Sequence, residues 1–160
     1  MFLSFTFVLI LAATAADGLL AGASLDQSIK QLPARHKLGP VAYSEYSRAS
    51  DLGPGILWYA ILGVGSAVLT IAAAVAAIFE GVPPAAATPL YVAAALAVLH
   101  SLATTQAAPT NFSQRRVAKD EAALAGVFDR FERWQRLRAT LQLLNFGAML
   151  WALVAYVSNL

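Results

Sequence analysis

The sequence predicts an all-α integral membrane protein, one transmembrane domain over residues 1–160 in which four helices cross the bilayer as a bundle. Two observations predict this fold. Of the 160 residues, 59% are hydrophobic and 12% are charged, whereas an ordinary soluble domain is about 45–50% apolar and about 25% charged. The chain also contains four apolar runs that reach the roughly 20 residues a spanning helix needs. These runs are residues 2–25, 56–79, 88–108 and 139–157.

The first run resembles a signal peptide only in its position. It has no basic segment before it, and its apolar stretch is longer than the apolar core of a signal peptide. We therefore expect a retained helix. Between the second and third runs, Gly81, Pro83, Pro84 and Pro89 predict a tight break between two antiparallel helices.

The positive charges fix the expected orientation. All 11 Lys and Arg residues lie in two segments, between the first and second runs and between the third run and the start of the fourth. Because basic loops stay in the cytoplasm, we expect both segments inside, both termini outside, and a location in the cytoplasmic (inner) membrane.

The two inner loops are expected to carry short amphipathic helices. Residues 26–32 continue the first helix, and residues 42–52 form a second short piece that ends at Gly53-Pro54-Gly55. Asn111 or Ser113 is expected to cap a helix that runs from the second loop into the fourth span.

Polar residues inside the spans are costly and therefore need an explanation. With a rise of 1.5 Å per residue, Asp17 and His100 lie about 12 Å from the cytoplasmic ends of their helices and Asn145 about 9 Å. This shared depth predicts a polar pocket lined by the first, third and fourth spans and open to the cytoplasm. In it Asp17 and His100 are the candidate catalytic pair, a base or proton relay. The candidate substrate-binding residues are Thr104, Asn111, Trp134, Arg138, Gln142 and Asn145. The alternative is that these groups hydrogen-bond one another and have only the structural role of holding the helices together.

Several classes of function are excluded by what the sequence lacks. With no cysteine there is no disulfide, thiolate metal site or iron–sulfur cluster. A net charge of +2 does not indicate nucleic-acid binding. The chain has no glycine-rich phosphate loop, no HExxH and no carboxylate cluster. We therefore expect neither a metal nor a cofactor.

Three stretches carry a resemblance to a known family. They are residues 16–23 (ADGLLAGA), 100–111 (HSLATTQAAPTN) and 133–142 (RWQRLRATLQ). In this order on four spans they look like the anthrone oxygenase-like family of small membrane proteins, many of whose bacterial members have no known function. The resemblance implies oxidation of an anthrone to an anthraquinone by molecular oxygen, without metal or flavin.

Single residues carry the resemblance further. Pro109 and Asn111 at the end of the third span match the family's pattern, as do Trp134 and Arg138 at the start of the fourth. Where many members have a histidine shortly after the tryptophan, this chain has Gln-Arg-Leu at residues 135–137.

Two hypotheses follow. In the first, the protein is a cofactor-independent oxygenase for a hydrophobic aromatic or quinone-like molecule, with Asp17 or His100 as base and Asn145, Gln142 and Arg138 holding the oxyanion. In the second, it is a non-catalytic accessory subunit of a larger membrane complex. Besides the lipid bilayer, the expected partners are a hydrophobic small molecule and further copies or subunits in a homo-oligomer or complex. A transporter is a third, weaker hypothesis.

Overall fold

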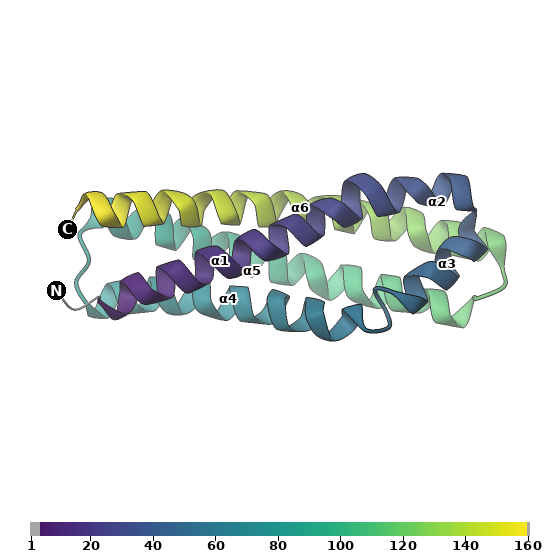
Figure 1. Ribbon diagram of the computed structural model, residues 1–160, viewed down its shortest axis with the longest axis horizontal. Helices are drawn as coiled ribbons and strands as arrows, with labels where there is room; N and C mark the ends of the chain where they lie inside the picture. The colour runs from purple at the N-terminus through teal and green to yellow at the C-terminus, as the bar shows by residue number, and fades with distance from the viewer. Residues whose placement is uncertain (1–3, 160) are drawn as a thin grey trace.

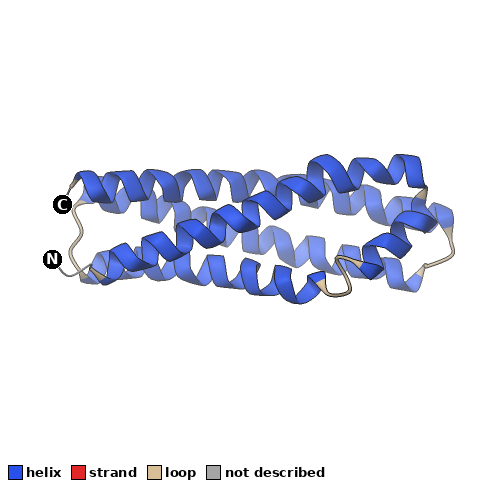
Figure 2. Ribbon diagram, viewed as in Figure 1, coloured by secondary structure: helices blue, strands red, loops and turns tan. Residues whose placement is uncertain are grey.

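The computed structural model describes residues 4–159 and is helical throughout, with no strand in that range (Figure 2). Residues 2 and 3 of the first predicted run lie outside the described part. A π-helix, η1 (Gln27–Gln31), joins the first two α-helices, and a 3-10 helix, η2 (Ser113–Arg116), follows the fifth. The α-helices are α1 (Phe5–Asp26), α2 (Leu32–Leu38), α3 (Pro40–Ala49), α4 (Gly55–Phe79), α5 (Pro84–Phe112) and α6 (Glu121–Ser158).

The predicted all-α class is confirmed, and four helical stretches of the described chain are long and apolar enough to cross a membrane. They are Phe5–Leu38, Gly55–Phe79, Pro84–Arg116 and Glu121–Ser158. The first, third and fourth stretches are longer than the predicted runs because polar residues extend them beyond the apolar part, whereas the second exceeds its run by Gly55 alone.

The four long helices form a ring in which neighbours pack side by side. α1 and α5 each contact α4 and α6, so that α1 and α5 stand at opposite corners. Both described chain ends and the turn between α4 and α5 lie at one end of the bundle, whereas α2, α3 and η2 lie at the other (Figure 1). The two segments that hold all Lys and Arg residues therefore share one end.

Two apolar cores stabilise the two ends of the bundle. At the end with the termini, small residues let the helices approach closely, with Ile10, Leu90, Met149 and Tyr156 filling the space between alanines. At the other end, Leu32, Tyr43, Ala107, Leu124, Phe128 and Phe131 form a second cluster. The ring of Tyr43 meets that of Phe128 edge to face at 4.9 Å, a favoured aromatic geometry. The polar residues of the spans lie between these cores.

Two local expectations differ from the structure. Pro89 does not end the connection but lies inside α5, where it is buried; Pro84 occupies the first turn. A proline this close to a helix start removes only one backbone hydrogen bond. The cap of α6 is Asp120 rather than Asn111 or Ser113, because those two residues end α5 and begin η2. The side chain of Asp120 accepts a hydrogen bond from the Ala123 amide at 2.9 Å.

The π-helix η1 lets one continuous helical stretch change its face. The amide of Leu32 donates to the carbonyl of Gln27, five residues back. Beyond this wide turn, Leu32 and Arg35 face inward. The Arg35 guanidinium binds Asp129 at 2.8 Å and Glu132 at 2.5 Å, which ties α2 to α6.

Candidate functional site

A cavity of about 620 Å³ lies between α4 and α5, in the half of the bundle nearer α3. Its wall is a stripe of α4 from Ile56 to Ile71, the face of α5 from His100 to Phe112, and Arg138 of α6. Several wall residues are also exposed on the outside of the bundle, so the cavity opens sideways as well as inward. They are Ile56, Ala60, Val64, Val68, Ile71, Ser101 and Phe112.

Arg138 brings a positive charge to this cavity without a carboxylate partner. Its Nη1 donates to Gln135 Oε1 at 3.0 Å. Its Nε is buried and has no hydrogen-bond partner within residues 4–159, and none of the ion pairs in that range includes it. Arg138 is half-buried, and a shielded N–H normally finds an acceptor, so this guanidinium is suited to hold an acidic group of a ligand.

His100 contributes a lone pair to the same cavity. Its Nδ1 lies 3.2 Å from the backbone carbonyl of Arg138. A carbonyl only accepts, so this contact assigns the hydrogen of the neutral ring to Nδ1 and leaves Nε2 as the acceptor. Across the described residues, Nε2 has no hydrogen-bond partner of its own. The imidazole is therefore oriented through one nitrogen and available through the other.

The end of the cavity nearest α3 is polar. Asp51, on the turn before α4, is buried, and its carboxylate accepts a hydrogen bond from Gln27 Nε2 at 3.0 Å. Burial raises the pKa of the Asp51 carboxyl above its ordinary 3.8, and the hydrogen bond from Gln27 lowers it in part. Tyr59 and Asn111 complete this end of the wall. The Asn111 side-chain oxygen is held by Gln114 Nε2 at 2.8 Å.

Asp17 lies outside the cavity, at the centre of a buried hydrogen-bond network. Its carboxylate is fully shielded from solvent. It accepts three hydrogen bonds, from Thr70 Oγ1 at 2.9 Å, Gln142 Nε2 at 3.0 Å and Asn145 Nδ2 at 2.9 Å. Gln142 also donates to the Asp17 backbone carbonyl at 3.2 Å. One side chain of α1 thus ties α4 and α6 together.

The structure separates the eight sequence-predicted site residues into a group of four, a group of three and one residue apart. His100, Thr104, Asn111 and Arg138 line the cavity. Gln142 and Asn145 bind Asp17 beside it, and Trp134 packs against the apolar cluster at the α2 end. The structure does not bring Asp17 and His100 together. Asp17 binds Gln142 and Asn145, whereas His100 binds the Arg138 carbonyl one to two turns away on α6, and α1 and α5 stand at opposite corners of the ring.

The contribution of α4 was missed by the sequence reasoning. The pocket was expected among the first, third and fourth spans, yet α4 supplies one whole side of the cavity and Thr70 of the Asp17 network. The signal available in the sequence is the set of small residues in α4, among them Ala60, Gly63 and Ala67, which line the cavity. Tyr59 also lies in the wall.

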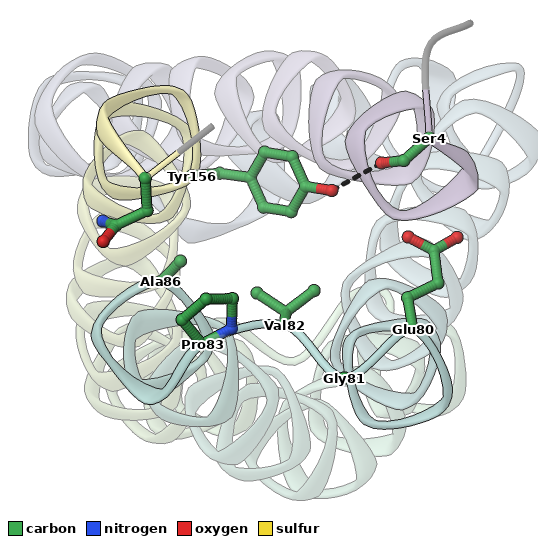
Figure 3. A pocket seen from close by; sticks show the side chains of 8 residues that line it. Ser4, Glu80, Gly81, Val82, Pro83, Ala86 and Tyr156 are labelled. Carbon is green, nitrogen blue, oxygen red and sulfur yellow. Dashed lines mark hydrogen bonds between the residues drawn. The ribbon is translucent and has the colours of Figure 1, made fainter.

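A second, smaller cavity of about 260 Å³ lies at the end of the bundle that holds the termini (Figure 3). Tyr156 reaches across it from α6 and bonds Ser4 at 2.5 Å, and Glu80 lies beside Ser4. The Glu80 carboxylate accepts a hydrogen bond from the Thr6 amide at 3.3 Å. These bonds join the first turn of α1 to α6 and to the α4–α5 turn, which accounts for the polar groups here.

Among residues 4–159 no group of three or more His, Cys, Asp or Glu side chains is placed to hold a metal ion. Comparison of the chain with protein-family models, with curated proteins and with solved structures finds no match.

Proposed function

We propose that the protein is a multi-pass protein of the inner membrane, with its basic end in the cytoplasm, and that the α4–α5 cavity binds an acidic hydroxyaromatic molecule and catalyses its oxidation by O₂. The observation that carries this proposal is the meeting of His100 Nε2 and the unpaired Arg138 guanidinium in one sideways-open cavity. The orientation is supported by the 11 basic residues at one end of the bundle.

The chemistry follows from these two side chains. His100 Nε2 accepts a proton from an acidic ring CH₂, such as that of the anthrone implied by the family resemblance. The negative charge of the resulting carbanion is delocalised onto the ketone oxygen of the ring system, where the Arg138 guanidinium stabilises it. The preorganised cation needs no solvent reorganisation at the moment of reaction.

The carbanion then reacts with O₂ without a further reductant. Its electrons form a C–O bond to O₂, and the peroxide takes up a proton. Loss of the second CH₂ proton and cleavage of the O–O bond release water and leave a carbonyl. Overall, one CH₂ and one O₂ give one C=O and one H₂O.

The proposal assigns roles that differ from the sequence expectation. His100 is the base, because it lines the cavity and no bond within residues 4–159 occupies its Nε2, whereas the Asp17 carboxylate is occupied by three donors. Arg138 holds the oxyanion. Gln142 and Asn145 instead hold Asp17 and keep α6 in register, so we assign all three to positioning.

The test is oxygen consumption with anthrone by the purified protein in phosphatidylcholine nanodiscs. His100→Asn keeps a side-chain donor for the Arg138 carbonyl but removes the Nε2 lone pair. Since a positioned base contributes about 10²–10⁴-fold, we expect the rate to fall at least about a hundredfold. His36→Asn, at an exposed histidine outside the cavity, is the matched control and should keep the wild-type rate.

Other outcomes decide against catalysis. A wild-type rate no higher than that of empty nanodiscs, or an undiminished rate in folded His100→Asn, refutes the proposed reaction. Native mass spectrometry of the protein from its own membranes then tests the accessory-subunit hypothesis, which requires stoichiometric partner subunits.

A further inference from the structure

The cavity is long. Its α4 wall runs over 15 residues from Ile56 to Ile71, which at 1.5 Å per residue is about 22 Å. An elongated molecule that lies along α4 therefore fits this wall better than a compact one.

The polarity of the wall changes along this length. α4 and α5 run antiparallel from a shared turn, and Gly63 and His100 each lie 16 residues from it, about 24 Å along the axis. His100 therefore stands opposite Gly63. Beyond this level, toward Ile71, the α4 wall is wholly apolar. Its residues there are Val64, Ala67, Val68 and Ile71.

The polar wall residues lie from the level of His100 toward α3, beside apolar ones such as Leu52, Phe112 and Phe131. They include Gln27, Asp51, Tyr59, Asn111 and Arg138. A ring bound at His100 and Arg138 does not reach the apolar half, which extends about 12 Å from Gly63 to Ile71. A hydrocarbon tail on the same molecule would cover the exposed side chains of that half, so an occupant with both parts matches the whole wall.

We propose that the ligand is an elongated amphiphile: a phenol-type ring whose hydroxyl reaches His100 and Arg138, with a hydrocarbon tail along α4 from Gly63 to Ile71. It reaches the cavity sideways from the bilayer, through the exposed apolar residues between α4 and α5. This inference rests on the proposed binding cavity and specifies its substrate class.

Photo-crosslinking tests the position of each end of such a molecule. The probe is 4-dodecylphenol with a diazirine either next to the ring or at the tip of the chain, in phosphatidylcholine nanodiscs. We expect the tip probe to label α4 between Val64 and Ile71, and the ring-proximal probe to label α5 near Thr104 or α6 near Arg138. A labelling pattern that does not depend on the diazirine position, or that covers exposed faces such as Val154 of α6 equally, overturns the inference.

A matched pair of glycines on α4 sharpens the test. A Cβ at Gly63 or at Gly65 meets no atom within 4 Å, so both positions accept a larger side chain without a clash at Cβ. Only Gly63 lines the cavity. Gly63→Leu should reduce labelling by the tip probe at least about tenfold, and Gly65→Leu should leave it unchanged. Equal effects of the two substitutions contradict the proposed tail path.

The two proposals fail separately. Labelling needs no turnover, so correct labelling without oxygen consumption refutes the reaction and keeps the ligand class. Turnover of chainless anthrone by a protein that the tip probe does not label on α4 keeps the reaction and refutes the tail.

Discussion

Replacement of Asp17 separates a structural from a chemical role for the carboxylate at the centre of the bundle. Asp17→Ala removes the acceptor for Thr70, Gln142 and Asn145. Interhelical hydrogen bonds in membrane proteins average about 0.6 kcal/mol, so the loss of three costs about 2 kcal/mol, and up to about 5 kcal/mol at the largest measured values. Asp17→Asn keeps one oxygen that accepts from Gln142 and Asn145, and its NH₂ donates to the Thr70 hydroxyl, which can also accept. We expect this variant to lose less than about 1 kcal/mol.

The assay is reversible unfolding in mixed micelles titrated with sodium dodecyl sulfate, followed by circular dichroism for the wild type and both variants. The order wild type, Asn, Ala in falling stability supports the network. An Asp17→Asn variant as unstable as Asp17→Ala would refute it, because the amide restores each bond geometrically. Under the proposed function, Asp17→Asn also retains oxygen consumption, whereas His100→Asn does not.

Three further predictions concern packing, the α2–α6 tie and pH. A Cβ on Gly18 lies 3.0 Å from Phe146, whereas one on Gly22 meets nothing within 4 Å; Gly18→Val should therefore cost about 1–3 kcal/mol in the same unfolding assay, and a cost for Gly22→Val of equal size would contradict the packing argument. Arg35→Gln breaks the bonds to Asp129 and Glu132; we expect a loss of about 2 kcal/mol and faster amide hydrogen exchange over residues 32–38, with exposed Lys37→Gln as the silent control. Burial raises the pKa of Asp51 above its unfolded value of 3.8. The contribution of Asp51 protonation to the free energy of unfolding is therefore fully present below pH 3.8 and is lost as the pH rises through the raised pKa. Asp51→Asn, whose side-chain oxygen still accepts from Gln27, should make the free energy of unfolding depend less on pH. An unchanged slope of this free energy against pH would contradict the raised pKa of Asp51.

The four long apolar helices and the common level of Asp17 and Asn145 could be predicted because both depend on distances along single helices. Apolar length and the rise per residue placed Asp17 level with Asn145, and the two side chains are bonded at 2.9 Å. Depth does not give the angle around the bundle axis. The expected Asp17–His100 pair therefore did not follow, since α1 and α5 stand at opposite corners.

Side chains whose role depends on tertiary contacts were not predictable in the same way. Thr70 is a small polar residue in an apolar helix, and nothing local distinguishes it from a residue that bonds its own backbone. Asp51 sits in a Gly- and Pro-rich turn, where an acidic residue usually faces water; here Gln27 of η1 and the start of α4 enclose it. The cavity itself is the space left by small residues such as Gly63, which a hydropathy pattern reports only as apolar.

The π-helix η1 fixes the number of residues that the chain needs between the two apolar cores. Its single extra residue turns everything that follows by about 100°, the angle of one helical step. Deletion of one residue from this turn would give a regular and locally more favourable helix, yet would swing Leu32 out of the apolar cluster and Arg35 away from Glu132. The π-helical turn is thus less favourable than a regular helix by itself, but the contacts of Leu32 and Arg35 require it. At this turn, insertions and deletions would be tolerated far less than substitutions, although every residue in it is an ordinary helix former.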